Sequence, residues 1–216
     1  MNVLPEVAVI VFAKAPVPGL AKTRLAPALG ADGAARLAAR MLEHAAAQAV
    51  EARVGPVEIC ASPEPAHPLF AQLAARHRLT LASQGEGDLG ERMFRAFARV
   101  LAGQGGGALL IGTDAPALDA AMLRRAASEL SRHGAVFVPA LDGGYALIGL
   151  RQAETRWFAD MPWSTPSVMS ETRKRMKAAG LDWTEFPPVA DIDEPADLPH
   201  VPPGWLTIDD AIRVEE

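Results

Sequence analysis

Short apolar runs alternate with helix-like segments along most of this chain, and this alternation limits the fold more than any other feature. The apolar runs predict strands over residues 7–12, 57–61, 79–81, 108–112, 135–139, 145–150 and 182–186. Between them, the patterns predict helices over 32–52, 67–76, 88–102, 119–132 and 165–179. The runs 135–139 and 145–150 leave no room for a crossover helix, so one strand should be antiparallel. We therefore expect a three-layer α/β/α fold with a mostly parallel sheet.

The length and composition suit one folded domain. The chain has 216 residues, of which 50% are hydrophobic and 22% charged, so it can bury a substantial core. We expect a single domain over 1–216, with its core over 7–198 and a C-terminal segment, 199–216, that wraps the surface. Proline and glycine become denser after Pro187, which is typical of such a segment.

The charge and the cysteine content indicate which binding partners and which cellular compartment to expect. The net charge of -5 gives no reason to expect nucleic-acid binding. No stretch is long and apolar enough to span a membrane, and the N-terminus lacks the basic region of a signal peptide, so we expect a cytoplasmic protein. Cys60 is the only cysteine, and its place in an expected strand favours a buried, inert thiol. The oligomeric state is open between a monomer and a homodimer.

Three cationic residues, Lys14, Lys22 and Arg24, follow the first expected strand. In open α/β sheets the ligand crevice lies outside the carboxyl ends of the strands. Lysine supplies point charges and arginine a bidentate fork, so cations at this place suit a phosphate chain. The loop matches neither the P-loop nor the dinucleotide-binding glycine pattern. A solvated basic loop is the alternative, but the rest of the loop is apolar.

A carboxylate follows the expected strand 108–112. Asp114 stands where Pro116 forces the chain to turn, and a carboxylate at a strand end is placed to bind a divalent cation. Oxygen ligands favour Mg²⁺ or Mn²⁺. The alternative role is a helix cap, but Asp119 is better placed to cap the next helix. Asp114 is therefore the first predicted metal ligand.

A second acidic cluster lies near the end of the expected core. Pro195 can begin a helix that Glu194 or Asp193 caps. One acid is enough for a cap, so the cluster has carboxylates to spare. A metal ion that bridges phosphate oxygens usually takes one or two protein carboxylates. Asp193, with Asp191 as the alternative, is the predicted second metal ligand.

A glycine-rich loop precedes the expected helix 88–102. Asp88 and Glu91 have the spacing of a capping box, which predicts the start of that helix. The glycines upstream allow a ligand ring to approach the backbone closely. Gln84 and the loop amides could read the edge of a nucleobase. Capping and base contact are compatible roles.

Two later segments are candidates for binding an acceptor. Asp142, Gly143 and Gly144 form an expected hairpin turn, whose flexibility and single carboxylate also suit an acceptor-binding loop. Trp163 belongs either to the core or to a substrate site. Thr165 is expected to cap the next helix, with a proline at the first helical position.

Several of these segments, in this order, resemble the DUF2064 family of bacterial proteins: residues 9–16, 22–25, 87–92, 112–116, 139–145 and 163–166. That family is described as transferase- or glycosyltransferase-like and belongs with the GT-A, nucleotide-diphospho-sugar transferase fold. The Lys-Thr-Arg-Leu segment at 22–25 also resembles the phospholactate guanylyltransferases. Residues 193–198 look like the late acidic motif of molybdenum-cofactor nucleotidyltransferases.

The resemblance implies a nucleotide that lies across the strand ends, with its base near 84–89. The implied nucleotide-binding residues are Ala13, Lys14, Lys22, Arg24, Gln84, Gly87, Asp88 and Leu89. Lys14, Lys22 and Asp114 would be catalytic, and Mg²⁺ or Mn²⁺ would be held by Asp114 and Asp193. The acceptor would contact Asp142, Gly143, Gly144 and Trp163.

The chain also departs from related patterns. Sugar nucleotidyltransferases open with a glycine-rich loop after the first strand, whereas this loop has Pro16, Pro18 and only Gly19. Many GT-A glycosyltransferases carry Asp-x-Asp, whereas Asp114 is followed by Ala115 and a proline. The second metal carboxylate must therefore come from elsewhere in the chain.

Three functions remain open. The first is nucleotidyl transfer from an NTP to a small phosphorylated acceptor with release of pyrophosphate, which the cationic loop favours. The second is glycosyl transfer from a nucleotide sugar, with Asp142 as an inverting base. The third is a nucleotide-binding domain without turnover.

Overall fold

The computed structural model describes residues 6–103 and 105–206. Its centre is a seven-stranded sheet in the order β3-β2-β1-β4-β6-β5-β7. The strands are β1 (Ala8–Lys14), β2 (Val57–Ser62), β3 (Thr80–Ser83), β4 (Ala108–Ile111), β5 (Ala135–Pro139), β6 (Tyr145–Leu150) and β7 (Trp183–Glu185). The α-helices are α1 (Ala26–Ala52), α2 (Pro68–His77), α3 (Leu89–Leu101), α4 (Ala120–Leu130) and α5 (Val168–Ala178).

The sheet is mostly parallel, as the sequence predicts. Strand β6 runs antiparallel to both of its neighbours, β4 and β5, and it directly follows β5 in the chain. All other neighbouring strands pair in parallel. The expected antiparallel strand is therefore β6, and it is the strand for which the connection is too short for a crossover helix.

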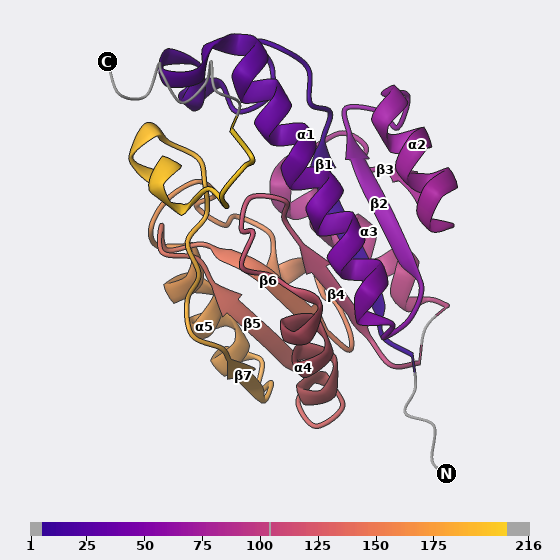
Figure 1. The fold of residues 1–216 in the computed structure, drawn as a ribbon. Coiled ribbons are helices and arrows are strands. Elements are labelled where there is room, and N and C mark those ends of the chain that lie inside the picture. Colours follow the sequence, from indigo (N-terminus) through magenta and orange to yellow (C-terminus); the bar gives the residue numbers. More distant parts are fainter. Residues whose placement is uncertain (1–5, 104, 207–216) are drawn as a thin grey trace.

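Helices cover both faces of the sheet (Figure 1). Val9 and Val11 of β1 belong to a buried cluster that includes residues of α1, α2 and α4. Ala8 and Ile10 point to the other face, where the cluster contains residues of α3 and α5. Because successive side chains of a strand alternate between faces, a strand covered on both sides must be apolar throughout. No helix in the described ranges is long and apolar enough to cross a bilayer.

The starts of α3 and α4 agree with the predicted caps, whereas the start of α5 does not. The Asp88 carboxylate accepts from the Glu91 amide at 2.9 Å in a complete capping box, and Asp119 caps α4. Helix α1 begins at Ala26, earlier than expected, but Gly30 interrupts it with a φ of 71°. The prediction that Thr165 caps α5 is wrong. Its hydroxyl instead donates to the Pro162 carbonyl at 2.7 Å, within a turn that precedes the helix.

The chain after β7 crosses the carboxyl edge of the sheet. Val189 bridges to Ala140 beyond the end of β5, and the Ile192 amide donates to the Asp114 carbonyl at 2.9 Å. Ile192 is buried beside α1, with Leu198. This path places the late acidic cluster next to the loop that follows β4. The last part of the expected surface segment, 207–216, lies outside the described residues.

Candidate functional site

The centre of the candidate site is the point where the chain changes direction across the sheet. Strands β1 and β4 are parallel neighbours, with Val11 opposite Ile111, so their carboxyl ends lie at the same edge. The chain passes from β1 to β2 on one side, whereas β4 is followed by strands on the other side. Such a switch point is where open α/β sheets bind ligands. Lys14 ends β1 and Asp114 follows β4 there.

Lys22 joins two carboxylates at this edge. Its Nζ lies 2.6 Å from Asp114 Oδ1 and 2.6 Å from Asp193 Oδ1, and it donates to the Ile192 carbonyl. Burial by itself would lower the pKa of Lys22, but the two neighbouring carboxylates raise the pKa overall. The two predicted metal ligands therefore converge on one cation, although they come from distant parts of the chain.

Asp114 and Asp193 are suited to hold a divalent metal ion together. Two carboxylate oxygens that already surround a positive charge form a donor set that suits Mg²⁺ or Mn²⁺. Within the described residues, no group of three or more His, Cys, Asp or Glu side chains could hold an ion. The protein would thus supply Asp114 and Asp193, and substrate phosphates and water would complete the shell.

A first hollow, the basic cavity, lies on the β1 side of Asp114. It is lined by Phe12, Ala13, Lys14, Ala21, Lys22, Ala38, Ser62, Gln84, Arg92, Thr113 and Asp114. Ala13, Lys14, Lys22 and Gln84 were expected here. Sequence reasoning missed Arg92. This residue stands four positions after Asp88, the cap of α3, and so lies on the same side of the helix as that cap. Its place in the segment 87–92 was the available signal.

Gln84 supports the wall of the basic cavity. Its Nε2 donates to the backbone carbonyls of Ala13 and Cys60, at 3.2 and 3.0 Å, and its Oε1 accepts from Arg92 at 2.9 Å. Both amide hydrogens are therefore used inside the protein. The side chain links the ends of β1 and β2 and fixes the Arg92 guanidinium.

Other predicted nucleotide contacts lie outside the basic cavity. Arg24 faces a separate hollow, and its guanidinium is 3.6 Å from Glu194. Gly87 and Asp88 do not line the basic cavity, and the Asp88 carboxylate is engaged in the cap of α3. Leu89, at the start of α3, faces the second cavity instead.

The second hollow, the acidic cavity, has a volume of about 240 Å³. It is lined by Leu89, Gly112, Asp114, Ala115, Ala140, Asp142, Gly144, Tyr145, Ala146, Trp163, Ser164, Thr165, Val168, Asp191 and Asp193. Three of the four expected acceptor contacts are among them. The fourth, Gly143, packs against the next loop, where a Cβ would lie 2.2 Å from the Pro166 carbonyl oxygen. Asp114 lines both cavities, so they meet at this carboxylate.

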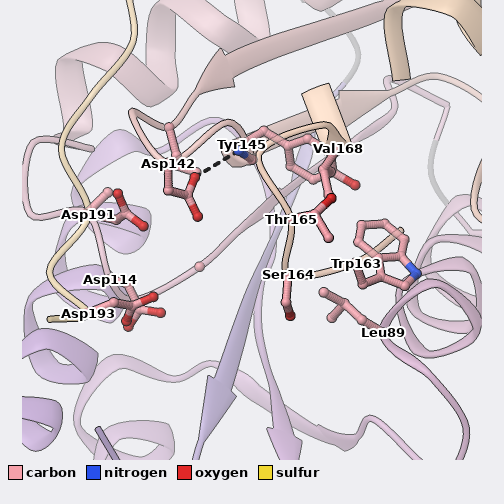
Figure 2. A pocket seen from close by; sticks show the side chains of 15 residues that line it. Leu89, Asp114, Asp142, Tyr145, Trp163, Ser164, Thr165, Val168, Asp191 and Asp193 are labelled. Atoms are coloured by element: carbon pink, nitrogen blue, oxygen red, sulfur yellow. Dashed lines mark hydrogen bonds between the residues drawn. The ribbon is translucent and has the colours of Figure 1, made fainter. Parts of the chain in front are cut away.

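Carboxylates gather on one side of the acidic cavity, as Figure 2 shows. Asp142 Oδ1 accepts from the Gly144 amide at 2.8 Å, which holds the turn in shape. Burial, followed by the charges of Asp142, Asp193 and Asp197, raises the pKa of Asp191 to about 6. The opposite side carries Trp163 and Leu89.

Comparison with known proteins assigns the chain first to a structural class and then to a family. The fold is the α/β fold of the nucleotide-diphospho-sugar transferase class. The chain belongs to the family DUF2064, described as uncharacterized proteins conserved in bacteria, whose model matches residues 44–165. No curated protein matches the chain.

Solved structures extend the likeness to the whole chain. A protein of Desulfovibrio desulfuricans G20, described as a "putative nucleotide-diphospho-sugar transferase", is 28% identical with a TM-score of 0.81, over 96% of this chain and 94% of that one. CMP:2-keto-3-deoxy-manno-octonic acid synthetase, in complex with CTP, is 12% identical with a TM-score of 0.57, over 97% and 99% of the two chains. Rv0371c of Mycobacterium tuberculosis H37Rv, in complex with manganese, is 18% identical with a TM-score of 0.54, over 98% of each chain. The two more distant structures share the fold.

Proposed function

We propose that the protein is a metal-dependent nucleotidyltransferase, which transfers a nucleotidyl group from an NTP to a small acceptor. One observation carries the proposal: a cavity lined by Lys14, Lys22 and Arg92 adjoins two carboxylates that converge on one cation. Cations along a triphosphate and a metal held by carboxylates are what this transfer requires of a protein.

The two cavities divide the substrates between them. The triphosphate lies in the basic cavity against Lys14 and Arg92, with Ala13 on its wall, and the base end extends toward the loop 84–88. Asp114 and Asp193 hold Mg²⁺ or Mn²⁺ where the cavities meet. The acceptor occupies the acidic cavity, beside Asp142, Gly144 and Trp163.

The residues serve the chemistry by position and charge. An oxygen of the acceptor's phosphate attacks the α-phosphorus, and the bond to the β-phosphate oxygen breaks to release pyrophosphate. Lys14 and Arg92 offset the negative charge that builds up along the phosphates. A metal ion held by Asp114 and Asp193 would neutralise further charge on the phosphates. A metal ion held by Asp114 and Asp193 would compete with Lys22, whose ammonium group contacts one oxygen of each carboxylate.

Glycosyl transfer from a nucleotide sugar is the second candidate. The 28% identical protein of D. desulfuricans, described as a "putative nucleotide-diphospho-sugar transferase", favours it. The same metal site would stabilise a nucleoside diphosphate as the leaving group, and Asp142 in the acidic cavity would act as the base.

Product analysis separates these candidates. Purified protein is incubated with each NTP or nucleotide sugar, Mg²⁺ or Mn²⁺ and a pool of small acceptors, and pyrophosphate and nucleoside diphosphate are measured. The proposal predicts metal-dependent release of pyrophosphate from an NTP, abolished by Asp114→Ala and unaffected by Glu43→Gln at an exposed position of α1. Release of nucleoside diphosphate from a nucleotide sugar would support the alternative. Metal-dependent NTP binding that survives Asp114→Ala would refute the assignment of the site.

A further inference from the structure

The acidic cavity has two walls of different chemistry (Figure 2). Asp114, Asp142, Asp191 and Asp193 face it from one side. Leu89 and Trp163 face it from the other, mainly apolar side, with Tyr145 and Val168 beside them, and the hydroxyl-bearing Ser164 and Thr165 also lie on this side. A ligand that fills this space must therefore match a polar wall and an apolar wall at the same time.

When its carboxylates are ionised, the polar wall accepts hydrogen bonds from a ligand but cannot donate them. Asp114 and Asp193 are paired with Lys22, and in the proposed function they would hold the metal ion. Asp142 uses one oxygen for the Gly144 amide, which leaves its other oxygen for a ligand. Asp142 and Asp191 therefore select a ligand that brings O–H or N–H donors.

The lining also selects against negative charge. None of the described residues that line the acidic cavity is Lys, Arg or His. An anionic group placed beside Asp142 and Asp191 would meet like charges with no cation from the lining to offset them. A phosphate of the acceptor can be accommodated only at the end of the cavity where Asp114 and Asp193 hold a cation.

The apolar wall and the volume limit the shape of the ligand. The Trp163 indole contacts Tyr145 edge to face, with ring centroids 6.5 Å apart, so its position is fixed by packing. The cavity volume of about 240 Å³ is below the range of roughly 300–1,000 Å³ that drug-sized ligands fill. A single substituted ring that places a non-polar face on Trp163 is the size of group that fits.

We propose that the acidic cavity binds a compact ring compound that bears hydroxyl or ammonium groups and carries no negative charge on the part inside the cavity. This inference rests on the proposed function in one respect, because it takes the acidic cavity to hold the acceptor. It narrows the acceptor class to neutral or cationic polyols, of which sugars and amino sugars are the simplest members. Any phosphate on such an acceptor lies at the metal end.

Three hexoses that differ in charge test this selection. Glucosamine, glucose and glucuronate are compared at pH 7 by saturation-transfer NMR, with EDTA present and no nucleotide. We expect glucosamine and glucose to bind and glucuronate to fail. Trp163→Leu should remove the signals of both bound sugars. The inference is overturned if glucuronate binds as tightly as glucosamine, if none of the three binds, or if Trp163→Leu changes nothing.

A charge-neutral variant gives a second, independent reading. Asp142→Asn combined with Asp191→Asn removes like charges and should therefore leave folding intact, which the thermal midpoint checks. We expect its glucosamine Kd to rise about tenfold and glucuronate binding to become detectable. The matched control, Asp160→Asn with Glu43→Gln, alters two exposed carboxylates outside the acidic cavity and should change neither. An unchanged preference in the Asn variant would contradict the role of these charges.

The outcome for the sugars is separable from the outcome for the nucleotide. NTP binding with metal is measured on the same protein by thermal shift. Sugar selectivity without any NTP shift would retain the cavity assignment and refute nucleotidyl transfer. A rise in Tm with an NTP but no preference among the sugars would retain nucleotidyl transfer and refute the assignment of the acidic cavity.

Discussion

Replacing Lys22 by methionine tests the carboxylate pair most sharply. The ammonium group is surrounded by Asp114 and Asp193, and the Lys22 side chain is only 9% exposed. Breaking a buried ion pair by removing one partner costs ~3–5 kcal/mol. The two carboxylates are 42% and 39% exposed, so water can take over part of the lost interaction. We therefore expect Lys22→Met to lower the free energy of unfolding by about 1–3 kcal/mol.

Thermal denaturation with EDTA or with excess Mn²⁺ measures both consequences. For a protein of this size, a loss of that order lowers Tm by roughly 5 °C in EDTA. Mn²⁺ should then raise the Tm of Lys22→Met more than that of the native protein, because the ion no longer competes with an ammonium group. The control is Lys174→Met, which removes a 73% exposed lysine beside Glu171 and should lower the Tm only slightly. An unchanged Tm in EDTA, or equal shifts with Mn²⁺ for both proteins, would refute the reasoning.

Three further predictions concern single groups elsewhere. Burial and then Glu58 raise the pKa of Cys60 to about 11, so its thiol should not react with Ellman's reagent at pH 8 until the protein unfolds; rapid reaction of the native protein would contradict this. Asp88→Ala removes the cap of α3 and should lower the free energy of unfolding in urea by about 1 kcal/mol; no loss would show that the cap is dispensable. Hydrogen bonds from Arg173 hold the pKa of Glu185 below its usual value, so this pair stabilises the fold above the unfolded pKa of the carboxyl group and loses that effect as the pH falls. Glu185→Gln should accordingly lower the Tm slightly at pH 7, with a difference that shrinks toward pH 3, whereas a loss that is independent of pH would contradict an ionic origin.

Several features that depend on neighbouring residues were predictable from the sequence, although the Thr165 cap was not among them. The capping box of α3 joins Asp88 and Glu91, and the cap of α4 joins Asp119 and Met122. Both need only a spacing of three residues. The antiparallel pairing of β5 and β6 follows likewise from a short connection, although the sequence left open which of the two strands is reversed in the sheet. The layers of the fold follow from the alternation of apolar runs and helix-like segments.

Features that depend on the path of the chain in space were not predictable. Arg24 and Lys22 are two residues apart, yet one faces Glu194 at the surface and the other lies between two carboxylates. A count of charges in the loop cannot separate these directions. Gln84 has the same limitation, because its amide bonds to Ala13 and Cys60 on two other strands. The sequence pattern therefore indicates residue types for the candidate site but not how they divide between two cavities.

A crystal structure with Mn²⁺ and the NTP that most raises the Tm is the most direct test of the site. Anomalous scattering locates manganese without ambiguity between metal and water. We predict one manganese peak between the Asp114 and Asp193 carboxylates, in contact with phosphate oxygens, and the triphosphate beside Lys14 and Arg92 in the basic cavity. Lys22 should have left the carboxylate pair. A manganese ion bound elsewhere, or an NTP outside the basic cavity, would contradict the proposed site.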